Sequence, residues 1–176
     1  MEKIKQKIFD KYIVKDGLDG LIHIEQTAHF GELIALGEDP SIVNAVWVGS
    51  LLHDIGRGRH LHKESHGEAG YRFLMENVDW LYEILSPFGF DIETVEKILL
   101  AVRDHDKGLV TNDKIIGSIW DSDRLSLYRF KGREVKTELL STETAKLLKD
   151  YAKQYIAETA VEKGDKDLWK EQGLMM

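Results

Sequence analysis

The sequence predicts an all-α protein, and three observations support that fold class. Valine and isoleucine recur at helical spacings, without the alternation that strands show. The chain contains only two prolines, Pro40 and Pro87, and both stand where helices are expected to begin or end. The length of 176 residues suits one domain, so we expect residues 1–176 to form a single domain.

In the first half of the chain, Asp39 and Pro40 are a helix cap and a first helical residue. The helix that they begin is apolar on nearly all sides, so we expect it to be central and buried. A basic, glycine-containing loop follows it over residues 56–65. The expected helices are one through Ile4, Ile8 and Tyr12, and others at about residues 21–36, 40–53, 66–76 and 78–85.

In the second half, Asp91 caps a helix that runs to about residue 106, and another helix covers about residues 113–129. Ser141 or Thr142 caps a long final helix, expected over about 141–163. Packing on the domain's own core is the common use of an apolar helix stripe, and a homodimer contact is the alternative. The stripe of the final helix consists of Leu147, Leu148, Tyr151, Tyr155 and Ile156.

Composition excludes several classes of protein. The chain has no cysteine, which rules out disulfides and thiolate metal sites. No apolar run is long enough for a membrane span, and no signal peptide is evident. The net charge of −7 argues against stable binding to nucleic acid or to anionic lipid. We therefore expect a cytoplasmic protein whose partner is a small molecule.

His53 and Asp54 stand where the buried helix ends and a glycine-rich turn begins. An ionised carboxylate in that place needs a partner, and a cation is one that both residue types can bind. Helical spacing places His23, His105 and Asp123 on the apolar faces of three other helices, and His66 begins the face of a further one. Each histidine alone is more typical of a packed core residue. Together they predict a metal site in the centre of a helical bundle.

Four ordered blocks of this sequence resemble the HD domain metal-dependent phosphohydrolases, over roughly residues 17–130. The resemblance implies an HD-type helical bundle with a metal site between its central helices, and it implies that His23, His53, Asp54 and Asp123 are the core metal ligands. The blocks are His23-Ile24-Glu25-Gln26-Thr27, Leu51-Leu52-His53-Asp54-Ile55-Gly56-Arg57, His66-Gly67-Glu68-Ala69-Gly70 and Trp120-Asp121-Ser122-Asp123-Arg124-Leu125.

Two further histidines resemble those of the two-metal branch of this family. His66 lies in a His-Gly-x-x-Gly block, and His105 is followed shortly by Gly108. In that interpretation both bind a second cation, and Asp54 bridges the two metals. The alternative is that His66 and His105 contact substrate phosphate around a single metal. The expected cofactor is one or two divalent ions, from among Mn, Fe, Co, Ni, Zn and Mg.

The predicted function is hydrolysis of a phosphate ester or anhydride of a nucleotide or another small phosphorylated metabolite. Asp54 would hold or deprotonate the attacking water, Arg57 would bind phosphate, and His62 is the candidate that protonates the leaving group. Arg124 is expected near the substrate, and together with Asp121 it would orient the metal ligands. Two alternatives remain: a di-iron oxygenase on the same scaffold, and a metal-stabilised binding module without activity.

Overall fold

The computed structural model describes residues 1–130 and 132–162, with side chains to residue 159. Over this part of the chain every regular element is helical, which confirms the predicted all-α class. None of its helices is long and apolar enough to cross a membrane. The α-helices are α1 (Glu2–Phe9), α2 (Leu21–Glu38), α3 (Val43–Leu52), α4 (His66–Glu76), α5 (Val78–Leu85), α6 (Ile92–Asp104), α7 (Lys114–Leu125), α8 (Glu143–Leu147) and α9 (Lys149–Glu162).

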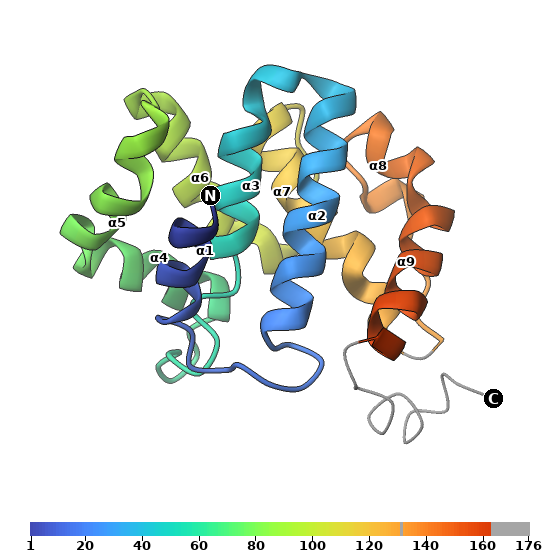
Figure 1. Cartoon of the computed structure of the whole chain (residues 1–176), viewed down its shortest axis with the longest axis horizontal. Coiled ribbons are helices and arrows are strands. Elements are labelled where there is room, and N and C mark those ends of the chain that lie inside the picture. The colour runs from blue at the N-terminus through green and yellow to red at the C-terminus, as the bar shows by residue number, and fades with distance from the viewer. Residues whose placement is uncertain (131, 163–176) are drawn as a thin grey trace.

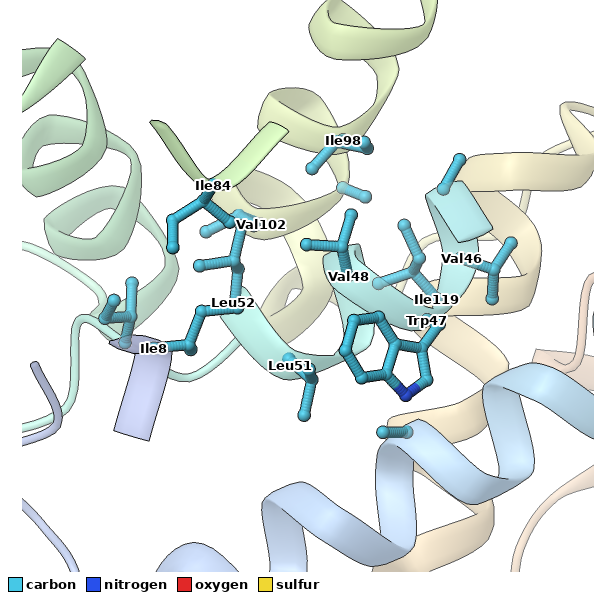
Figure 2. Close-up of a cluster of buried hydrophobic side chains, with 14 of the residues drawn as sticks. Ile8, Val46, Trp47, Val48, Leu51, Leu52, Ile84, Ile98, Val102 and Ile119 are labelled. Carbon is cyan, nitrogen blue, oxygen red and sulfur yellow. The ribbon is translucent and has the colours of Figure 1, made fainter. Parts of the chain in front are cut away.

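Helix α3 lies at the centre of the bundle, as its all-round apolar sequence predicts. Every residue from Ala45 to Leu52 is buried. Helix α2 runs beside it in the opposite direction, α4–α6 lie on one side, and α8 and α9 lie on the other (Figure 1). Figure 2 shows Val48 and Leu52 of α3 packed among Ile98 and Val102 of α6, within the larger of two apolar clusters.

The final helix differs from the prediction, because the chain forms two helices over 143–162 where one was expected. The amide of Leu148 donates to the carbonyls of both Thr144 and Ala145, and the helix breaks there. Thr142 caps α8 by accepting a hydrogen bond from the amide of Ala145. The break allows residues of both helices to pack into the second apolar cluster. Its members are Phe30, Ile34, Leu125, Tyr128, Val135, Leu140, Ala145, Ala152 and Ile156.

The expected stripe is only partly covered by the chain. Leu148 and Tyr155 pack against the second cluster, and Ile156 is buried within it. Leu147, in contrast, is 84% exposed, because it lies on the outer side of α8. Most of the stripe therefore serves the core of the protein itself.

Two other predicted helices end earlier than expected, in single turns of 3₁₀-helix. Helix α6 stops at Asp104 and continues as His105–Lys107, and α7 continues as Ser126–Arg129. Likewise, α3 ends at Leu52, so that His53 is its C-cap residue. Both His53 and His105 thus stand at a helix end, where a side chain can reach the carbonyls of the last turn.

A close approach of backbones holds the turn after His53 against α4 and α6. A Cβ atom on Gly56 would lie 2.0 Å from the carbonyl oxygen of His66 and 2.3 Å from the amide nitrogen of Gly70. A Cβ on Gly67 would lie 2.6 Å from the carbonyl oxygen of Arg103. Any side chain at these positions would separate the three segments, since backbone atoms cannot move aside as side-chain ends do.

We therefore predict that Gly56→Ala lowers the free energy of unfolding by about 1–3 kcal/mol or more, as overpacking does. Denaturant unfolding measures this change. The control is Gly89→Ala, where φ is +65° but no atom lies within 4 Å of the added Cβ, so only backbone strain is introduced. A loss at Gly56 no larger than the loss at Gly89 would contradict the close-packing account.

Candidate metal centre

The ends of five helices bring the predicted ligands together. His23 is near the start of α2 and His53 follows α3, and both of these helix ends point downward in Figure 1. His66 is the first residue of α4, where Ser65 caps the helix and Glu68 completes a capping box. The other two ends supply His105, just after α6, and Asp123, near the end of α7.

One oxygen of Asp54 faces the first group of candidate ligands. Oδ2 lies 3.2 Å from Nε2 of His23 and 3.5 Å from Nε2 of His53. Oδ1 of Asp123 lies 3.5 Å from each of the same two nitrogens. The two Nε2 atoms are themselves only 3.2 Å apart. This group has the two nitrogens and two oxygens that a divalent cation of intermediate hardness takes.

The other oxygen of Asp54 faces a second pair of histidines. Oδ1 lies 3.2 Å from Nε2 of His105 and 3.3 Å from Nε2 of His66. Asp54 itself is fully buried. Its two oxygens therefore lie close to different pairs of histidines, which is the arrangement that a bridging carboxylate requires.

The far side of each histidine ring fixes which nitrogen is free. Nδ1 of His53 lies 2.7 Å from the carbonyl oxygen of Ser50, and Nδ1 of His105 lies 2.8 Å from that of Val102. A carbonyl only accepts, so Nδ1 carries the proton in both rings and Nε2 keeps its lone pair. Such a tether is the usual support of a histidine that binds a metal through Nε2.

His23 is held in the same sense by a hydroxyl group. Its Nδ1 lies 3.1 Å from Oγ of Ser126, and that hydroxyl donates its own proton to the carbonyl of Asp123 at 2.6 Å. The Ser126 hydroxyl is therefore an acceptor for Nδ1, and Oγ1 of Thr27 lies 3.2 Å from the same nitrogen. Protonation at Nδ1 leaves Nε2 free.

With the rings so oriented, the Nε2 lone pairs converge with the carboxylates of Asp54 and Asp123. Arg57 neutralises part of this negative charge, and a bound cation would satisfy the rest. The residues present thus fit a divalent metal.

In the absence of metal, a proton takes the place of the cation. Burial alone would lower the pKa of His53, but the carboxylates of Asp54 and Asp123 outweigh it and raise the pKa to about 10. Burial and the charge of Arg129 lower the pKa of His23 to about 4. Although burial opposes ionisation of Asp54 and Asp123, their histidine neighbours hold the pKa of both carboxyls below the ordinary range.

Asp106 supports His66 and was not predicted from the sequence. Its Oδ2 lies 3.3 Å from Nδ1 of His66 and accepts a hydrogen bond from the amide of Gly67. Its Oδ1 is buried and has no hydrogen-bond partner among the described residues. Its position directly after His105 could have indicated this role, because Asp106 and His105 share the turn that ends α6.

Arg57 lies against the cluster, where the family resemblance expects a cation. Its Nε donates to Oδ2 of Asp54 at 2.5 Å, and its Nη1 is 3.6 Å from Oδ2 of Asp19. The guanidinium group is half-buried and lines the cavity beside the cluster. Arg57 is thus placed both to neutralise Asp54 and to meet an anion in that cavity.

Arg124 and Asp121 were expected to orient the metal ligands, but in the structure they contact backbone groups of neighbouring segments. Nη1 of Arg124 donates to the carbonyl of Leu139 at 2.6 Å and to Asp121, and Nη2 donates to the carbonyl of Leu109. Asp121 accepts from the amides of Ser141 and Thr142. Both side chains therefore fasten the segment before α8 to α7. Arg124 lines the cavity, but these contacts to the protein use much of its guanidinium group.

The structure does not bring His62 to the cluster. The side chain is exposed, and the histidines that line the neighbouring hollow of about 500 Å³ are His60 and His66. This hollow and a larger cavity of about 890 Å³ share Asp19, Arg57 and His66. His62 was preferred because it lies four residues before His66. The loop over 56–65 is not helical, so this spacing does not place the two histidines on one side.

The larger cavity also contains basic residues that sequence reasoning missed. Arg129, Arg133 and Lys136 line it together with His66, His105 and Asp123. They belong to a second basic stretch, after α7, where only the end of a helix was expected. In an acidic chain, that second stretch was the signal.

The raised pKa of His53 predicts that metal binding displaces a proton. The bound proton stabilises the metal-free fold fully below pH 6.5, and this stabilisation is lost as the pH rises through about 10. Between those values, metal affinity should rise with pH, with release of about one proton per ion at the first group. Titration calorimetry in buffers of different ionisation enthalpy measures the release. Binding without proton release at pH 8 would contradict the assignment.

Comparison with known proteins gives one family and one similar structure. The HD domain family model matches residues 20–141, a range that contains all six candidate ligands. A crystal structure from an uncultured Thermotogales bacterium, named as a predicted HD superfamily hydrolase, has a TM-score of 0.59 and 18% identity and covers 93% of each chain. No curated protein matches the sequence. The chain belongs to the HD domain family.

Proposed function

We propose that the protein is a metal-dependent phosphohydrolase that cleaves a phosphate ester or anhydride of a nucleotide or another small phosphorylated metabolite. The observation that carries this proposal is the position of the Asp54 carboxylate. Its two oxygens face two different pairs of histidines, at 3.2–3.5 Å from the Nε2 atoms. Membership of the HD domain family supports the same interpretation. His23, His53 and Asp123 would hold one cation with Asp54, and His66 and His105 would hold a second.

The residues of the chain have distinct parts in such a reaction. A divalent cation bound here would polarise a phosphoryl oxygen and lower the pKa of a bound water. Asp54 would hold that water in position through its carboxylate. Arg57, which already contacts Asp54, would meet the phosphate oxygens with its remaining N–H groups. The carbonyl tethers of His53 and His105 keep their rings in position throughout.

The cavity beside the cluster is suited to an anionic metabolite. Its volume of about 890 Å³ is within the range of sites that enclose a whole small molecule. Its lining has five cationic side chains and four carboxylates, whereas the chain as a whole has a net charge of −7. Half-buried Phe130 and the partly buried Leu127 add apolar surface, so the lining can accommodate the organic part of a phosphate ester as well.

The proposal is tested by metal analysis and a substrate screen on a matched pair of variants. Asp123→Asn should lower metal content and reduce hydrolysis of the best phosphate substrate by more than about a hundredfold, the upper end for loss of a supporting residue. Asp121→Asn removes the same charge from the same helix. It should lower the melting temperature, because Asp121 fastens residues 141 and 142, while metal content is retained.

The screen is run with manganese under anaerobic and aerobic conditions. Turnover without oxygen is expected, and turnover that requires iron and oxygen would instead favour the oxygenase alternative. If Asp123→Asn retains both metal and activity, the ligand assignment fails. If the wild-type protein binds metal but hydrolyses no phosphate ester or anhydride, the proposed activity fails and the binding-module alternative gains support.

A further inference from the structure

The segment between the end of α7 and α8 places two basic side chains on the rim of the large cavity. Arg133 and Lys136 are both exposed and both line this cavity, which is also lined by His66, His105 and Asp123. The candidate metal centre and the two cations therefore border one continuous space. The cations lie outside the cluster and are not needed to build it.

These two cations differ from the other cationic residues of the cavity, which are paired with aspartates of the described chain. Arg57 and Arg129 both contact Asp19, and Arg124 contacts Asp121. The acidic neighbour Glu134 is paired with Lys153 of α9. Among the described residues, neither Arg133 nor Lys136 forms an ion pair. Their positive charge is therefore available to a ligand.

The segment that carries them is fixed to the protein at several points. Val135, which lies between the two cations in sequence, is buried in the second apolar cluster, and so is Leu140. The amide of Arg133 donates to the carbonyl of Phe130, and Arg124 holds the carbonyl of Leu139. The backbone that presents the two charges is therefore ordered before any ligand arrives, which lowers the entropic cost of binding.

We propose that Arg133 and Lys136 form a second anion subsite, which binds a phosphate group of the substrate other than the one that reacts. The inference rests on the proposed function and narrows it. The substrate class is a small metabolite with two separated phosphate groups, of which the metal cluster receives one and the rim the other. The cavity is large enough for such a molecule, and a simple monoester would leave the rim without a partner.

Two ligands that differ by one phosphate test this subsite: adenosine 5′-monophosphate and adenosine 3′,5′-bisphosphate. Titration calorimetry on the manganese-loaded protein measures their affinities without any need for turnover. The wild-type protein should bind the bisphosphate about 10- to 100-fold more tightly, as charge-assisted hydrogen bonds allow, and the preference should weaken as salt is added. R133A/K136A should lose this preference and keep its affinity for the monophosphate.

The control is K3A/K146A, which removes the same charge from positions that do not line the cavity, and it should keep the wild-type preference. Because both rim residues are exposed, the melting temperature of R133A/K136A should match that of the wild-type protein. The subsite is refuted if the wild-type protein shows no preference or if R133A/K136A retains it. Loss of hydrolysis with an intact preference would instead count against the proposed function alone.

Discussion

The rest of the structure depends on one buried carboxylate, that of Asp54. Removing a charged carboxylate from water costs several kcal/mol unless opposite charges and hydrogen-bond donors surround it. The side chain has no solvent exposure, and its near neighbours are His23, His53, His66, His105 and Arg57. Four of these five neighbours are histidines whose Nε2 atoms face the carboxylate, which is an arrangement that suits a divalent cation.

The fold supplies this surrounding through helix ends and close backbone contacts. Gly56 and Gly67 allow the turn after α3, the start of α4 and the end of α6 to meet, and that meeting brings His66 and His105 to Asp54. Asp121 and Arg124 then fasten the segment before α8 to the last helix of the site. The same helices and contacts therefore position both the cluster and the basic residues at the rim of its cavity.

Much of this arrangement could be predicted from helical periodicity. The spacing of apolar residues indicated that His23, His105 and Asp123 face the interior, and the structure brings them together around Asp54. The site residues that were not predicted lie in segments without helical periodicity. The spacing of His62 from His66 was misleading in a loop that is not helical, and the segment carrying Arg133 and Lys136 is positioned by contacts with distant residues. The break at Leu148 likewise depends on packing against a core formed from distant residues.

Anomalous diffraction from crystals of the manganese-loaded protein tests the central claim most directly, because it locates each ion without reference to activity. The account predicts two manganese peaks, one beside Oδ2 of Asp54 with His23, His53 and Asp123, and one beside Oδ1 with His66 and His105. A single peak at the first group would contradict the bridging role of Asp54. The absence of any peak at Asp54 would contradict the metal centre as a whole.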